Sequence, residues 1–124
     1  MADEITIRQT LTAKGTTTPN VNRTASYTAD AGSDFSGEIA SVPTTAAGTA
    51  LTVAAAVANK GWSYFRNVDP TNFVDIDIQV SSTFHPFARL LPGEECHIPL
   101  SPAVALFARA DTASVRLSYG VFEA

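Results

Sequence analysis

Charged residues are scarce in this sequence, and that scarcity limits what the protein can bind. They make up 16% of the 124 residues, and the formal net charge is −4; soluble domains usually carry roughly a quarter. The eight Lys and Arg residues are scattered singly, so the chain lacks the clustered basic surface with which proteins bind nucleic acid. A weakly charged surface suits a protein that covers part of itself with partners.

Cysteine and long apolar runs are also nearly absent. A single cysteine, Cys96, excludes an internal disulfide, and we expect it to be a small buried apolar residue rather than an exposed nucleophile. The longest apolar runs, 53–58 and 103–108, are far too short to cross a bilayer. The acidic start of the chain has no secretory signal pattern. We therefore expect a soluble protein that is made in the cytosol and has no membrane partner.

What the sequence does contain is a series of short alternating segments separated by Pro, Gly, Asn and Asp. In the segment 73–80 the apolar residues recur at every second position, at Val74, Ile76, Ile78 and Val80. The segment 113–122 repeats this pattern with Val115, Leu117, Tyr119 and Val121. Each pattern predicts a strand with one buried face and one face turned to water or to a partner.

Applied to the whole chain, this pattern predicts an all-β fold without helices. Strands are expected at 4–13, 22–29, 35–42, 50–53, 62–68, 73–80, 87–90, 95–100, 103–110 and 113–122. About eight to ten short strands at this spacing are typical of an antiparallel β-sandwich, here expected to be jelly-roll-like. The strand at 50–53 is the least defined, because the alanines of 49–58 also allow a helical turn.

The two ends of the chain differ in composition, and this suggests how it is organised. The first 50 residues are rich in Thr, Ala, Ser and Gly. We expect residues 1–21 to form an extended N-terminal strand or arm, and residues 22–124 to form a single β-sandwich domain. The segment 14–21 contains three consecutive threonines before a Pro-Asn pair, which is typical of a loop that is ordered by a sheet or a partner.

Carboxylates and histidines provide the nearest approach to a metal site. Asp75 and Asp77 lie two residues apart on one predicted strand, so they face the same side and could share Ca²⁺ or Mg²⁺. Asp69, His85 and His97 are the other candidate ligands. The pattern lacks the glycine-bearing loop and the bidentate glutamate of a dedicated calcium site, and a solvated strand face explains it equally well. We expect no metal and no cofactor.

Catalytic groups are not predicted either. A nucleophilic site needs a Ser or Cys close to a His, but no serine lies in a nucleophile elbow. Cys96 and His97 are adjacent and therefore point to opposite faces of a strand. A carboxylate pair for glycoside hydrolysis, drawn from Glu38, Glu94 and Glu95, stays open because such pairs can be distant in sequence. We expect a protein that is not an enzyme.

Aromatic and arginine side chains suggest contacts with other molecules. Trp62 and Tyr64 lie two residues apart and so share a face, which either packs in the core or a subunit interface or stacks against a sugar. Arginine outnumbers lysine six to two. Because arginine is enriched at protein interfaces and lysine is depleted there, this ratio favours contacts with protein partners.

The stretch 61–123 also carries a set of short motifs that resemble a known group of proteins. They are Arg66-Asn67-Val68-Asp69, Thr71-Asn72-Phe73-Val74, Phe87-Ala88-Arg89-Leu90, Pro92-Gly93-Glu94 and the run 108–113. In these motifs the stretch is similar to small β-sandwich virion accessory proteins of tailed bacteriophages, which are capsid cement or decoration proteins or tail and neck components. The resemblance covers about half of the chain; the first half is similar only in composition and layout.

The resemblance implies a non-enzymatic structural protein of the virion, first of all a capsid cement protein that binds across the seams between capsid subunits. The implied partners are further copies of the chain, as a dimer or trimer, and the major capsid protein. The N-terminal arm and the loops at 69–72 and 86–92 are the expected contact elements. The expected contact residues are Arg8, Thr17, Pro19, Arg66, Asp69, Asn72, His85, Phe87 and Arg89.

Three other functions stay open. The nearest is a tail or neck accessory subunit of the same kind of particle. From a different class comes a carbohydrate-binding β-sandwich module that uses Trp62 and Tyr64 together with Asp75 and Asp77. A small hydrolase with a carboxylate pair is the third.

Overall fold

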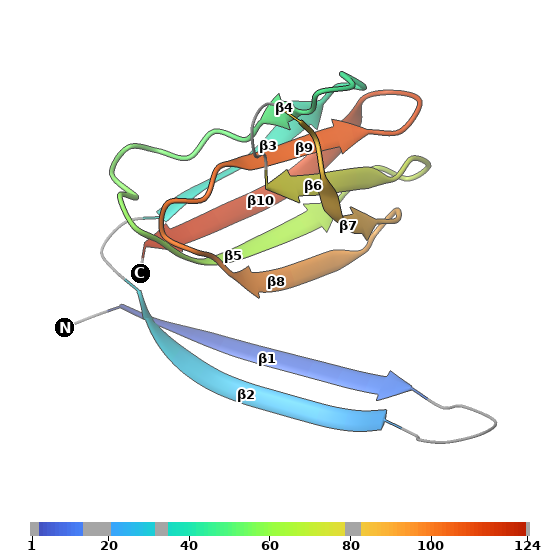
Figure 1. The fold of residues 1–124 in the computed structure, drawn as a ribbon. Coiled ribbons are helices and arrows are strands. Elements are labelled where there is room, and N and C mark those ends of the chain that lie inside the picture. The colour runs from blue at the N-terminus through green and yellow to red at the C-terminus, as the bar shows by residue number, and fades with distance from the viewer. Residues whose placement is uncertain (1–2, 14–20, 32–34, 79–82, 124) are drawn as a thin grey trace. The chain divides into compact units, whose positions relative to one another are not determined.

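The structure is a computed structural model that describes residues 3–13, 21–31, 35–78 and 83–123. Every regular element in these ranges is a β-strand, and none of the described residues belongs to a helix that could span a membrane. The chain divides into two compact units, residues 1–33 and residues 34–124. Figure 1 shows the ribbon of both units. The all-β fold predicted from the sequence is therefore confirmed.

The first unit is a long antiparallel hairpin. It pairs β1 (Asp3–Ala13) with β2 (Val21–Ala31) over their whole length, from Asp3 opposite Ala31 to Ala13 opposite Val21. The hydroxyl oxygens of Thr10 and Thr24 lie 3.3 Å apart across the pair. The sequence suggested an arm that ends near residue 21, but β2 pairs with β1 rather than joining the sandwich, so the division falls after residue 33.

The second unit contains two four-stranded antiparallel sheets. The first sheet has the order β3-β10-β5-β8 and the second has the order β4-β9-β6-β7. The strands are β3 (Phe35–Val42), β4 (Thr49–Ala50), β5 (Lys60–Asn67), β6 (Val74–Ile78), β7 (Pro86–Leu90), β8 (Glu95–Pro99), β9 (Leu106–Ala110) and β10 (Val115–Glu123). The pairing is nested, since β3 pairs with β10, β4 with β9, β5 with β8 and β6 with β7. The two sheets pack into the antiparallel sandwich that the alternating segments predict.

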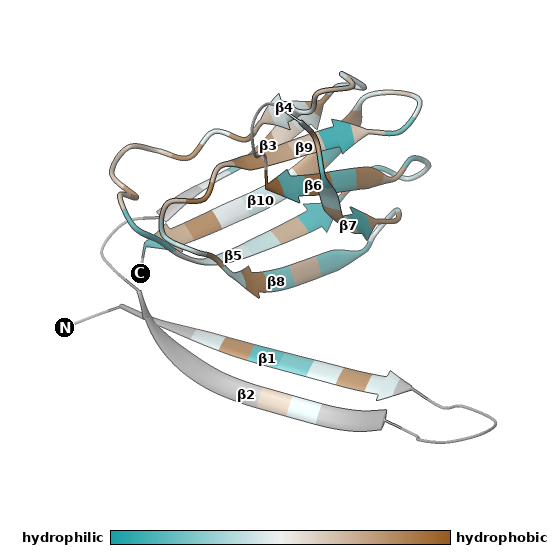
Figure 2. Cartoon of the chain, viewed as in Figure 1, coloured by the Kyte–Doolittle hydropathy of each residue, from teal (hydrophilic) through white to brown (hydrophobic). Residues whose placement is uncertain are grey.

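The core lies between the two sheets and follows from the period-two patterns. The inward residues of β10 that the sequence predicted, Val115, Leu117, Tyr119 and Val121, are all fully buried. They belong to one hydrophobic cluster with Phe65 of the same sheet and Val74 and Ile76 of the opposite sheet. Figure 2 shows hydrophobic and hydrophilic segments alternating along the strands of this unit. Burial of apolar surface at about 25 cal/mol per Å² is the main stabilising contribution of such a core.

Several predicted strands are shorter in the structure. The segment 50–53 contributes only the two-residue strand β4, and the segment 103–110 becomes a strand only from Leu106 onward. The predicted continuation of β6 beyond Ile78 falls partly on residues 79–82, which lie outside the described ranges. The late start of β9 falls where Pro102, Ala103 and Ala105 weaken strand propensity.

One polar group in the core is that of Tyr119, which joins β10 to β3 and to the loop after β4. Its ring is fully buried, and its hydroxyl oxygen lies 2.8 Å from Glu38 Oε1 and 2.7 Å from the carbonyl oxygen of Thr52. Burial, together with the neighbouring Glu38 carboxylate, raises the pKa of Tyr119 well above the ordinary range of a phenol. The phenol thus stays protonated and keeps donating its hydrogen bond.

Candidate functional site

Three turns gather at one end of the sandwich, and together they form what we call the turn end. They are 68–73 between β5 and β6, 91–94 between β7 and β8, and 111–114 between β9 and β10. Backbone hydrogen bonds tie the turns to neighbouring strand ends: Val68 N donates to Arg116 O on β10 at 3.0 Å, and Gly93 N donates to Asn67 O at the end of β5 at 3.0 Å. A longer one runs from Asp111 N to Phe73 O at 3.3 Å. The turns therefore form one connected surface (Figure 1).

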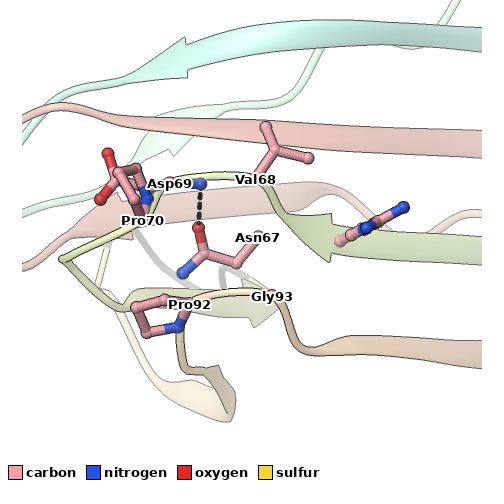
Figure 3. Close-up of a pocket in the computed structure, with 7 residues that line it drawn as sticks. Asn67, Val68, Asp69, Pro70, Pro92 and Gly93 are labelled. Carbon is pink, nitrogen blue, oxygen red and sulfur yellow. Dashed lines mark hydrogen bonds between the residues drawn. The ribbon is translucent and has the colours of Figure 1, made fainter.

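Asn67 is the buried side chain that holds this end together. Its Nδ2 donates to the carbonyl oxygens of Asn72 at 2.8 Å and Leu90 at 3.0 Å. Its Oδ1 accepts a hydrogen bond from Asp69 N at 2.9 Å, as Figure 3 shows. One amide thereby satisfies groups from its own turn and from the end of β7. Such buried polar groups are costly to leave unpaired, so the amide fixes the path of the chain here.

Asp69 shapes the outer part of the same turn. Its Oδ1 accepts hydrogen bonds from Asn72 N at 2.7 Å and Thr71 N at 2.8 Å. These two backbone donors, that of Asn72 first, lower the pKa of Asp69 below its ordinary value. Pro70 follows directly and fixes the backbone of the turn. The Asp69 carboxylate is thus part of the turn's structure.

A depression of about 390 Å³ opens between two of these turns (Figure 3). It is lined by Arg66, Asn67, Val68, Asp69, Pro70, Pro92 and Gly93. Gly93 has a φ of 82°, a left-handed conformation that side-chain-bearing residues rarely adopt, and this allows the tight turn before β8. Because the depression is open and rimmed by two prolines and the exposed Val68, its shape suits contact with another protein better than enclosure of a small molecule.

A row of charged side chains crosses the outer face of the second sheet beside the turn end. Asp75 on β6 stands directly opposite Arg89 on β7 and Arg109 on β9. Arg89 binds the Asp75 carboxylate through Nε at 2.8 Å and Nη2 at 3.0 Å, and Arg109 Nη2 lies 3.7 Å from Asp75 Oδ2. We call Arg109, Asp75 and Arg89 the arginine row. Its geometry is the bidentate pairing that arginine makes with carboxylates.

Aromatic rings and a carbonyl group hold the two guanidinium groups of the row in place. The guanidinium of Arg89 lies 3.7 Å from the centre of the Phe73 ring, and that of Arg109 lies 4.3 Å from the centre of the Phe84 ring. Arg109 Nη1 also donates to Ala46 O at 3.0 Å. The Arg89 side chain remains 56% exposed, so its other N–H groups face solvent. A stacked, pre-positioned arginine of this kind loses little freedom when a partner binds it.

The structure corrects one expectation about the aspartates of β6. Asp75 and Asp77 do share a face, but that face is not wet at these positions, since both side chains are buried. Asp75 is covered by its two arginines, and the carboxylate oxygens of Asp77 have no hydrogen-bond partner among the described residues. In the described part of the chain no three His, Cys, Asp or Glu residues come close enough to hold a metal ion together.

The proposed sugar site is also not assembled. Trp62 and Tyr64 alternate with the buried Phe65, so they lie on the outer face of the first sheet and are half-buried there. Asp75 and Asp77 lie on the outer face of the second sheet, on the far side of the core. The aromatic pair and the carboxylate pair therefore cannot contact one ligand.

Cys96 and His97 lie on opposite faces of β8, as predicted. Cys96 is half-buried and packs against the hydrophobic core, while His97 is exposed opposite Tyr64. Burial, with a smaller effect of Glu95, raises the pKa of the Cys96 thiol. The thiol is therefore mostly protonated at neutral pH and poorly suited to act as a nucleophile.

The structure brings together only some of the predicted contact residues. Arg66, Asp69, Asn72 and Arg89 lie at or beside the turn end. His85 and Phe87 are exposed at the start of β7, away from that end, and Arg8 is exposed on the hairpin. Thr17 and Pro19 lie outside the described residues. Sequence reasoning missed the roles of Asn67, Phe73, Phe84 and Arg109, which depend on strand pairing that no local pattern reveals.

No family model, no curated protein and no solved structure matches this chain. Similarity to known proteins therefore assigns it no function. Any function has to be inferred from the fold and from the side chains described above.

Replacing Asn67 with aspartate tests whether its amide holds the turn end. The variant keeps the size of the side chain but turns two donors into acceptors that face the carbonyl oxygens of Asn72 and Leu90. We expect the free energy of unfolding to fall by about 2–4 kcal/mol, measured by urea denaturation. The same change at the exposed Asn59 should alter it by less than about 0.5 kcal/mol. Equal effects at the two positions would contradict this role.

The lowered pKa of Asp69 predicts a contribution to stability that depends on pH. A carboxylate whose pKa is lower in the folded state stabilises the fold above its unfolded pKa, about 3.9, and loses this effect as the pH falls through the folded value. We expect wild type to be more stable than Asp69→Asn at neutral pH, and the difference to shrink below about pH 4. Urea midpoints measured from pH 7 to pH 2 test this, and a difference that does not change with pH would refute it.

Proposed function

We propose that this chain is a non-enzymatic structural protein of a tailed-phage virion, a capsid cement protein that binds across the seams between capsid subunits. The major capsid protein and further copies of the chain are its proposed partners. No nucleic acid or membrane is involved in this proposal. The head is the proposed location, and a tail or neck position is the nearest variant.

The hairpin formed by β1 and β2 is the observation that carries this proposal. Two strands of eleven residues each form a unit of their own, and they make hydrogen bonds to no third strand among the described residues. A two-stranded hairpin is at best marginally stable in water without a further surface to pack on. Leu11, which is 61% exposed, is an apolar side chain available for such packing. A hairpin of this form is suited to lie on a neighbouring protein, by packing or by strand addition.

The nested strand pairing of the second unit supports the proposal. We infer that it corresponds to a jelly-roll, in which two four-stranded sheets are built from strands paired first with last and inward from there. Viral capsid domains and lectins both use this fold. Because one fold serves many functions, the pairing is compatible with a virion protein without singling it out.

The turn end supplies a second contact surface in this proposal. Arg89 offers a stacked guanidinium group beside it, and the depression between Pro70 and Pro92 offers an open, proline-rimmed surface. Arginine is enriched at protein interfaces, and the buried centre of an interface is more apolar than the rest of the surface. Two separate contact surfaces on one small chain allow it to bridge two subunits.

Bridging would stabilise only the assembled particle. A protein that binds the assembled state and not the free subunits shifts the equilibrium toward assembly, by an amount that grows with occupancy. The carbohydrate-binding alternative is less favoured, because its aromatic and carboxylate residues lie on opposite outer faces of the sandwich.

The proposal predicts that the hairpin is required for binding to particles. Particles purified from a phage that lacks this gene would be mixed with the purified full-length chain, and bound protein would be measured after sedimentation. Wild type should bind to saturation. Because one charge is reversed and an apolar contact becomes charged, Arg8→Glu/Leu11→Lys should bind about tenfold more weakly or worse.

Two controls make this result specific. Ala55→Lys adds a charge at an exposed position outside both proposed contact surfaces and should bind as wild type does. The thermal midpoint of the double variant should match that of wild type, which shows that the sandwich is intact. A wild-type chain that does not bind, or a double variant that binds equally well, would contradict the proposal.

A further inference from the structure

The edges of the two sheets differ in how well they are protected from pairing with another strand. An edge strand exposes unpaired backbone N–H and C=O groups, and natural proteins usually shorten, bend or charge such edges. The outermost strands here are β3 and β8 in the first sheet and β4 and β7 in the second. Three of these four carry a protecting feature.

The protected edges are easily recognised. β4 has only two residues. β7 begins with Pro86 and has a register shift against β6. β8 contains Pro99, which lacks an N–H group, and carries the exposed Glu95 and His97. Each of these features hinders the addition of a further strand.

β3 is different. It has eight residues without proline or register shift, and among the described residues it pairs with β10 alone. Gly37, Glu38, Ile39 and Ser41 are exposed along it. Ile39 stands opposite Ser118, on the outer face of the sheet, and is 57% exposed. A long, regular edge with an exposed isoleucine near its middle is a site for strand pairing.

Glu38 is the one charged residue on this edge, and its position leaves the edge accessible. A charge on an edge strand opposes pairing when an incoming strand would bury it without a partner. Here Glu38 stands opposite Tyr119 on β10, and its Oε1 lies 2.8 Å from the Tyr119 hydroxyl oxygen. The carboxylate is therefore drawn back over its own sheet, away from the open side of β3.

We infer that β3 pairs in antiparallel fashion with β3 of a second copy of this chain, about a two-fold axis that passes beside Ile39. In an antiparallel pair, residues that stand directly opposite each other face the same side of the sheet. The two-fold axis must therefore lie midway between the two copies of one residue. The two copies of β3 overlap over the greatest length when the axis lies at Glu38 or at Ile39. Placing two Glu38 residues opposite each other is destabilising, whereas pairing two Ile39 residues covers both exposed side chains.

This register sets the other contacts as well. It places Glu38 opposite Ala40 of the second copy and Gly37 opposite Ser41, so small side chains accommodate the carboxylate. The result is one continuous eight-stranded sheet across two copies. The inference deepens the self-association in the proposed function, but its test requires no virion, so either can fail while the other stands.

Sedimentation equilibrium of the full-length chain over a range of concentrations tests the inference. Wild type should form a reversible dimer. Ile39→Lys and Ile39→Asp should each raise the dissociation constant about tenfold or more, because like charges then stand opposite each other. An equal mixture of the two variants should recover dimers, since opposite charges then meet at the axis. Ala55→Lys, at an exposed position outside β3 and the turn end, should leave the dissociation constant unchanged.

Disulfide cross-linking tests the register itself. In a Cys96→Ser background, Ile39→Cys should form an intermolecular disulfide on mild oxidation, because the two cysteines face each other across the axis. Ser41→Cys should cross-link far more slowly, since it stands opposite Gly37. A wild-type chain that stays monomeric at all concentrations would overturn the inference. An oligomer that Ile39→Lys leaves intact, or equal cross-linking at the two positions, would overturn it as well.

Discussion

Pairing between strands that are far apart in the sequence is the constraint on which the rest of this structure depends. The first strand of the sandwich, β3, pairs with the last, β10, and the remaining pairs are nested within this one. The second sheet is complete only with β9 and the first only with β10, the last two strands of the chain. The same nesting brings the turns 68–73, 91–94 and 111–114 to one end and leaves β3 as a regular open edge. The proposed contact surfaces of the sandwich are thus consequences of its topology.

Three buried polar side chains depend on this pairing, because the hydrogen-bond partners of each lie on other strands or turns. Asn67 binds carbonyl groups of the following turn and of β7, Asp75 binds arginines of β7 and β9, and Tyr119 reaches Glu38 on β3. A shift of one residue in any of these pairs would leave a polar group buried without its partner. We therefore regard these contacts as determinants of register more than as sources of net stability.

The sequence predicts the fold well where a strand's own pattern decides its structure. The alternation in β10 and β6 predicted both the strands and their buried faces. It failed where the partner decides: no local signal shows that β2 pairs with β1 instead of joining the sandwich. Likewise, the alternation of residues in β6 places Asp75 on the solvent-facing side of the strand. It is buried because two arginines from other strands cover it. Of the predicted contact residues, Arg66, Asp69, Asn72 and Arg89 come together because their strands and turns end on the same side.

We propose that this weakly charged sandwich and its hairpin make contact with other proteins. The central claim is that these contacts are made in an assembled phage head. Quantitative mass spectrometry of purified particles tests it most directly, by counting this chain relative to the major capsid protein. We expect a fixed ratio that follows the number of capsid subunits. A count that fits only a single ring would move the protein to the neck or tail, and its absence from the particles would contradict the account.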